Sequence, residues 1–314
     1  MAVATLFLLG GCIRISHAIP PWPDKPGGSI TLSPGDGLII PAQINGHPMR
    51  LRVDIGYGGI ILNPEAALRA GLPESMFSAA ANIGRVRVQG KTSVVPVAMG
   101  GSQDEDRRIA WYERPVTSGA DGVISIAHLP YEVVTLRLRP AAPGEVPLAF
   151  ETNPQQGSAD VINRHSIGDK DINVRFSLEA PRSLVSAAAG ALLAEHHGGT
   201  WSGDAFEHPI ALEISRPVRP MRFARPVSVN GLWVDQVLVR TADYKGKYAL
   251  PTDVPDPATA DPSEIVVTGQ GAKSRAILTA ILGRDHLSAC SSITYVHTTR
   301  ILTLQCRTDL LSQR

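Results

Sequence analysis

The chain has 314 residues, of which 43% are hydrophobic and 19% charged, so a packed core is expected and general disorder is excluded. A formal net charge of +1 at pH 7 argues against a nucleic-acid partner, which would need a basic face, and none is expected. Aromatic residues are scarce at 5%, whereas 25 prolines and 29 glycines predict many turns between short strands.

Residues 1–18 have the features of an export signal. Ala2 to Cys12 is an apolar run too short to span a bilayer, and Ser16-His17-Ala18 is a small-x-small cleavage site. Leu9-Gly10-Gly11-Cys12 also resembles a bacterial lipobox, in which Cys12 is lipidated. A buried N-terminal strand is the alternative interpretation. The chain is therefore expected to be exported, either as a periplasmic protein or as a lipoprotein whose only membrane contact is this anchor.

The first half of the chain predicts a strand, a turn and a short helix in succession. Residues 49–53 form a strand that ends at Asp54, and the glycine-rich turn 55–59 follows. Asn63 suits a helix N-cap, and Gly71 predicts the end of that helix.

Further elements are expected before the middle of the chain. Residues 86–97 alternate in polarity around Gln89-Gly90, which predicts a hairpin. An apolar segment at 121–129 then leads into a strand at 133–138. Residues 141–168 are rich in Pro, Gly, Asn and Gln and are expected to form a linker.

The second half repeats this order of elements. A strand ends at Glu179, and a helix is expected from Ser186 to His197. A hairpin around Asn230-Gly231 comes next, and an apolar segment at 280–287 follows. The repetition predicts an all-β protein with two related lobes, and a β-sandwich is the alternative. The expected lobes are residues 30–140 and residues 169–308.

Two cysteines lie near the C-terminal end. Cys290 and Cys306 flank two strands, 293–296 and 300–304, whose turn is expected near 297–299. A disulfide across this hairpin fits an oxidising compartment. Two unpaired core cysteines are the alternative.

At this point the residues resemble a known family. Asp54-Ile55-Gly56, with the apolar run Ile60-Ile61-Leu62, resembles the start of a retropepsin-type aspartic peptidase. Ala280-Ile281-Leu282-Gly283-Arg284-Asp285 resembles the later apolar-apolar-Gly element of that family. The resemblance covers about residues 38–139 and 172–306. It implies an all-β, bilobal pepsin-like (acid protease) fold made of two retropepsin-like lobes with short helices.

The resemblance also implies one catalytic acid per lobe at the base of a peptide-binding cleft. Asp54 and Glu179 take the two catalytic positions, and Gly56, Tyr57 and Gly58 are expected to contact the substrate. Two neighbouring carboxylates share one proton, so one activates a water while the other donates to the scissile carbonyl. This chemistry needs no metal and no cofactor.

The sequence departs from the family pattern around both acids. Ile55 and Ala180 replace hydroxyl residues, and Pro181 replaces a glycine. Glutamate is one methylene longer than aspartate, and a small misplacement of a catalytic group lowers rates strongly. No glycine-rich flap tip lies between Gly71 and Ile83, so the lid is expected within residues 200–225.

Each candidate acid also has a structural interpretation. Asp54 can cap a turn, and Glu179 can be a solvated residue at a strand end. Asp243 is a rival second acid, and His196-His197 lacks the partners of a zinc motif. The sequence therefore favours a monomeric, exported, aspartic-peptidase-like protein with a peptide or protein partner and impaired hydrolysis. A peptide- or protein-binding pseudopeptidase is the alternative.

Overall fold

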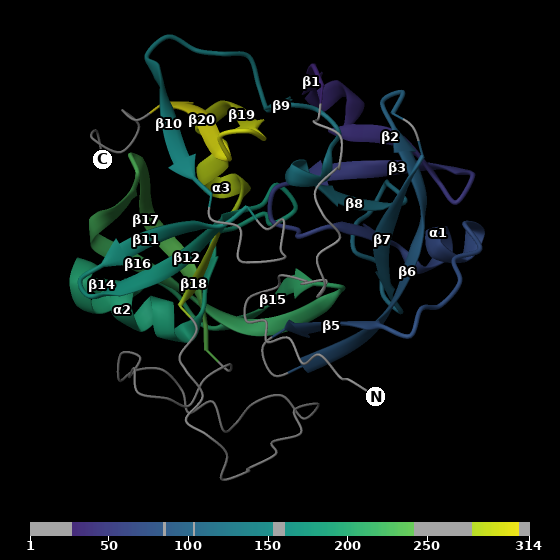
Figure 1. Cartoon of the computed structure of the whole chain (residues 1–314). Coiled ribbons are helices and arrows are strands. Elements are labelled where there is room, and N and C mark those ends of the chain that lie inside the picture. Colours follow the sequence, from purple (N-terminus) through teal and green to yellow (C-terminus); the bar gives the residue numbers. More distant parts are fainter. Residues whose placement is uncertain (1–26, 84–85, 103, 153–160, 242–277, 308–314) are drawn as a thin grey trace.

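The computed structural model describes residues 27–83, 86–102, 104–152, 161–241 and 278–307. It shows a mostly β protein with two lobes and few short helices (Figure 1). The predicted signal with Cys12 and the rival acid Asp243 lie outside the described residues. None of the described helices has the length and apolarity needed to cross a bilayer.

The first lobe is a seven-stranded sheet in the order β2-β3-β8-β4-β7-β6-β5. Because β2 also pairs with β6, the sheet curls back on itself. Buried aliphatic side chains alternate along its strands and fill the interior. Its elements are β2 (Ile39–Ile44), β3 (His47–Asp54), β4 (Ile60–Leu62), α1 (Pro64–Arg69), β5 (Ser78–Ile83), β6 (Val86–Met99), β7 (Glu105–Tyr112), β8 (Gly122–Ser125) and the 3-10 turn η2 (Ile126–His128).

The second lobe has the strand order β11-β12-β18-β13-β17-β16-β14, and β15 pairs with β16 outside this path. Helix α2 packs on strands of this sheet, and its mostly buried sequence suits that position. Its elements are β11 (Asn163–Ile167), β12 (Lys170–Phe176), β13 (Leu184–Val185), α2 (Ala187–His197), β14 (Gly199–Trp201), β15 (Phe206–Ala211), β16 (Ile214–Val229), β17 (Leu232–Arg240), β18 (Thr279–Leu282) and α3 (Arg284–Leu287).

The two lobes share one topology. In the first, β3 runs parallel to β8 and β4 runs parallel to β7. In the second, β12 runs parallel to β18 and β13 runs parallel to β17. In addition, β4 pairs antiparallel with β8 in the first lobe, and β13 pairs antiparallel with β18 in the second. The predicted repetition is therefore confirmed by independent strand pairings.

A third sheet joins the lobes in the order β1-β9-β19-β20-β10. The predicted linker, residues 141–168, supplies β10 to this sheet and β11 to the second lobe. The predicted cysteine hairpin is confirmed, with the Cys290–Cys306 disulfide across it. Its strands are β1 (Ser29–Leu32), β9 (Val133–Arg137), β10 (Glu145–Glu151), β19 (Cys290–Val296) and β20 (Ile301–Arg307).

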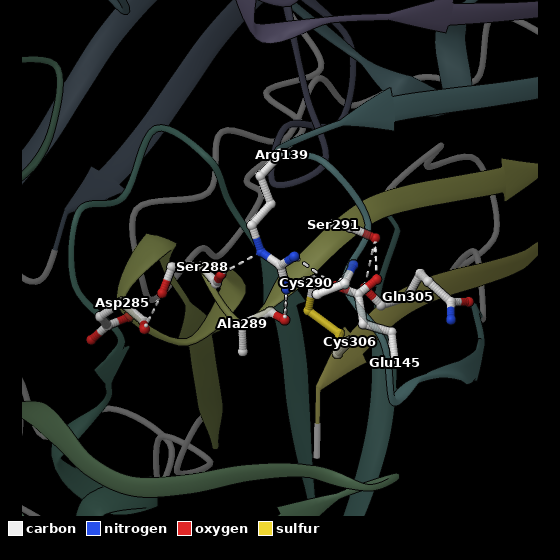
Figure 2. Close-up of a disulfide and its surroundings, with 10 residues drawn as sticks. Arg139, Glu145, Asp285, Ser288, Ala289, Cys290, Ser291, Gln305 and Cys306 are labelled. Atoms are coloured by element: carbon white, nitrogen blue, oxygen red, sulfur yellow. Dashed lines mark hydrogen bonds and ion pairs between the residues drawn. A yellow bond between two sulfur atoms is a disulfide. The ribbon is translucent and has the colours of Figure 1, made fainter. Parts of the chain in front are cut away.

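Figure 2 shows hydrogen bonds and ion pairs of charged side chains in this third sheet, beside the disulfide. The Arg139 guanidinium pairs with Glu145 at 2.6 Å and donates to the carbonyl of Ala289, also at 2.6 Å. The hydroxyl of Ser291 donates to the other carboxylate oxygen of Glu145. These contacts link the end of the first lobe to the second lobe.

The hairpin predicted around Gln89-Gly90 is wrong. Gly90 lies inside the continuous strand β6, directly opposite Tyr112 on β7. A Cβ at Gly90 would lie 2.6 Å from the Tyr112 ring, so this glycine provides room for an aromatic side chain and forms no turn. The turn falls instead at Gly100 and Gly101, which both have positive φ.

Both predicted helices form, but the side chains of the two residues that precede them make different hydrogen bonds. Ser186 accepts a hydrogen bond from the Ala189 backbone and caps α2 as expected. The Asn63 side chain does not cap α1; it binds the backbone of Val116, Thr117 and Ala120. Asn63 therefore fixes a loop that borders the interlobe pocket.

Candidate functional site

Asp54 lies at the end of β3, where the first lobe meets the second. The turn after it is close to the other lobe, since a Cβ at Gly56 would lie 3.1 Å from the Cβ of Ser177. A side chain at position 56 would require Ser177 and the Phe176 carbonyl to shift by a few tenths of an ångström. Glycine at this position is therefore explained by the close approach of the lobes.

The Asp54 carboxylate accepts three hydrogen bonds and is completely buried. The Ser177 hydroxyl donates to Oδ2 at 2.9 Å, and the Leu178 backbone N–H donates to Oδ1 at 2.6 Å. The Gly56 N–H donates to Oδ2 at 3.3 Å. Burial raises the pKa of Asp54 to about 6, although the Leu178 and Ser177 hydrogen bonds oppose this rise. Both carboxylate oxygens are therefore engaged within the protein.

The strand registers place Ser177, and not Glu179, at the position in the second lobe that corresponds to Asp54. Val123 on β8 pairs with both Arg52 and Ile61, and Ile281 on β18 pairs likewise with Arg175 and Leu184. Asp54 lies two residues after Arg52, and Ser177 lies two residues after Arg175.

The helix caps confirm this alignment of the lobes. Ser177 precedes the cap Ser186 by as many residues as Asp54 precedes Asn63. The predicted equivalence of Glu179 with Asp54 is therefore wrong by two residues. It followed from taking the nearest acid in the sequence as the counterpart of Asp54.

Glu179 is a contact between the lobes. It accepts a hydrogen bond from Arg52 Nη1 at 3.0 Å, which is also an ion pair, and another from the Thr117 hydroxyl at 3.0 Å. Both donors belong to the first lobe. The negative charge of Glu179 adds a smaller contribution to the raised pKa of Asp54.

A pocket of about 310 Å³ lies between the lobes. Of the predicted substrate contacts, Gly56 and Tyr57 line it, as does Glu179, whereas Gly58 and Asp54 are not among the described lining residues. Ser177 lines the pocket and separates it from Asp54. Ser177 therefore lies between the buried Asp54 carboxylate and the space that a ligand would occupy.

The hairpin of β15 and β16 borders this pocket, and its tip falls within residues 200–225, the range expected for the lid. Residues 208–213 of the hairpin line the pocket. At its tip, Leu212 is 2% exposed and packs with Tyr57, Ile61 and Val116 of the first lobe. The lid thus comes from the second lobe and is docked on the first.

A buried cluster that the sequence did not reveal supports the second-lobe turn. Ser183 donates its backbone N–H and its hydroxyl to Asp285, at 2.8 and 2.7 Å. The Ser183 oxygen also lies 2.7 Å from His286 Nδ1. Ser183 has no exposed surface, so it cannot reach a substrate as a nucleophile. The cluster positions the turn that forms one wall of the pocket.

The described residues contain no group of three or more His, Cys, Asp or Glu side chains that could hold a metal ion. His196 and His197 end helix α2 and contribute to no such group in this part of the chain.

No family model matches the sequence, and no curated protein matches it either. The structure is similar to that of an aspartic proteinase. The crystal structure from Irpex lacteus is 11% identical and aligns over 88% of this chain and 96% of its own, with a TM-score of 0.41. EIAV protease, complexed with the inhibitor HBY-793, is 17% identical and aligns over 28% of this chain and 79% of its own, with a TM-score of 0.23. The fold itself is established by the strand pairings described above.

Proposed function

We propose that this chain binds an extended peptide between its lobes and does not hydrolyse it. One observation supports the absence of hydrolysis. The second-lobe counterpart of Asp54 is Ser177, whose hydroxyl donates a hydrogen bond to the Asp54 carboxylate. Aspartic peptidase chemistry needs two carboxylates that share a proton and activate a water. A buried acid that accepts three internal hydrogen bonds serves instead to hold the lobes together.

Peptide binding is supported by the free edge of the lid. Among the described strands, β15 pairs only with β16, so its outer edge retains backbone donors and acceptors. Residues 208–211 of β15 line the pocket. An extended peptide can add to such an edge as a further strand.

Residual hydrolysis by Asp54 and Glu179 is the second candidate. Glu179 lines the pocket, and its charge contributes to the raised pKa of Asp54. Export of the chain is part of the proposal, because the buried Cys290–Cys306 disulfide suits an oxidising compartment.

Two measurements test the proposed function. A peptide library is incubated with the wild type and with Asp54→Asn between pH 4 and pH 7, and we expect the same absence of cleavage with both. Cleavage that the wild type performs and Asp54→Asn lacks would instead establish a peptidase.

Binding is measured with a pool of peptides blocked at both ends. We expect Ala211→Trp, which fills the pocket beside β15, to abolish binding, and the exposed Ala149→Trp to leave it unchanged. Equal binding by the two variants would place the peptide elsewhere.

A further inference from the structure

We propose that the corner of the pocket formed by Arg182 and His208 binds the C-terminal carboxylate of a peptide whose last side chain is apolar. This inference rests on the proposed peptide-binding function and specifies which part of a peptide the pocket takes.

Arg182 and His208 come from different elements and face the same cavity. Arg182 lies in the turn before β13, and His208 lies on β15 of the lid. Within the described chain, neither the Arg182 guanidinium nor the His208 imidazole makes a hydrogen bond or ion pair. His208 is 8% exposed, and burial followed by the positive charge of Arg182 lowers its pKa. A buried imidazole and a half-buried guanidinium therefore line the same cavity, close enough for the charge of one to act on the other.

Two of the acids near this corner already have partners, and a third pocket-lining acid, Glu213, is exposed at the tip of the lid. Glu179 is bound by Arg52 and Thr117. Asp285, whose charge acts on His208, accepts hydrogen bonds from Ser183 and His286. A carboxylate brought by a ligand would therefore meet an arginine that no described carboxylate pairs with. Charge-assisted hydrogen bonds of this kind are short and strong.

Apolar side chains line the pocket beside the basic corner. Leu184 and Ile281 lie on neighbouring strands of the second lobe, and Ile210 of the lid packs against Leu184. They provide a surface for the side chain next to the carboxylate. The cavity, at about 310 Å³, is at the small end of the range of ligand pockets, which suits the end of a peptide better than a long segment.

The experiment compares N-acetyl-Ala-Ala-Ala-Leu with a free carboxylate and the same peptide with a C-terminal amide, by calorimetric titration at pH 7. We expect the acid to bind at least about tenfold more tightly than the amide, as the loss of one charged partner predicts. Arg182→Gln should remove this difference, and Arg182→Lys should keep part of it. Arg137→Gln, on the exposed side of β9, is the matched control and should keep all of it.

Equal affinity for acid and amide, no binding of the acid, or a difference that survives Arg182→Gln would each overturn the inference. Inorganic phosphate that binds as tightly as the acid would also overturn it, because the site would then be a general anion site. If blocked peptides bind and the carboxylate gives no advantage, this inference alone fails. If neither blocked nor free peptides bind, the proposed function fails with it.

Discussion

Asp54 carries a carboxyl group that the fold buries completely, and burial raises its pKa from 3.8 to about 6. The native state therefore holds this proton more tightly than the unfolded chain does. It follows that the free energy of unfolding falls as pH rises through this interval and is constant above it. Relative to Asp54→Asn, the wild type should lose about 2 kcal/mol of its free energy of unfolding between pH 4 and pH 7, as measured by urea unfolding at each pH.

Asp285 provides a control of opposite sign. Although burial opposes it, hydrogen bonds from His286 and Ser183 lower the pKa of Asp285 to about 2. The contribution of this group to stability is present above its unfolded pKa and is lost only as pH falls toward 2. The free energy of unfolding of Asp285→Asn should therefore change with pH as that of the wild type does between pH 4 and pH 7. If the free energy of unfolding of Asp54→Asn also follows that of the wild type, Asp54 does not titrate in this interval.

At the scale of elements, the lid hairpin has a turn that lacks the residues typical of such turns. Leu212 and Glu213 form the two-residue turn, and both have positive φ, at 51° and 55°. Such turns favour Asn-Gly, as at Asn230-Gly231 between β16 and β17. Leucine is accommodated here because its side chain is buried against the first lobe. Local sequence patterns cannot reveal a turn whose strain is offset by contacts with a distant part of the chain.

The same burial predicts how the lid responds to mutation. Leu212→Ala removes a side chain that is 2% exposed, and truncations of this kind weaken local packing by about 2–5 kcal/mol. We expect the amides of β15 to exchange with solvent faster in this variant, as measured by hydrogen exchange with mass spectrometry. Leu68→Ala on α1, where the leucine is 83% exposed, should leave exchange in β15 unchanged. Unchanged exchange in both variants would show that Leu212 does not hold the lid.

At the scale of the whole molecule, the sequence predicted the duplication but not the alignment of its halves. The helix that follows the Ser186 cap and the Asn230-Gly231 turn depend on nearby residues, and both are confirmed. The pairing of Asp54 with Ser177 depends on registers in two separate sheets, which an inspection of acids does not supply. The Ser183–Asp285 contact spans 102 residues and carries no local pattern either. The two-residue error in the second lobe also moves Ala180 and Pro181 out of the positions that the sequence pattern assigned to them.

The third sheet contains the disulfide and pairs strands from both lobes. Cys290 and Cys306 are fully buried on β19 and β20, and β19 also pairs with β9 of the first lobe. In the chain-entropy model, closing a loop of this length stabilises the fold by about 3 kcal/mol. Replacing both cysteines with alanine should therefore lower the free energy of unfolding by about this amount while the transition remains single.

The transition is followed by tryptophan fluorescence and by circular dichroism, since Trp111 reports on the first lobe and Trp201 on the second. Wild type treated with a reductant that opens the bridge should behave like the double variant. Coincident curves from the two probes indicate that the shared sheet couples the lobes. Separate transitions, with only the second lobe weakened, would mean that β9 and β19 do not transmit the effect of the disulfide between the lobes.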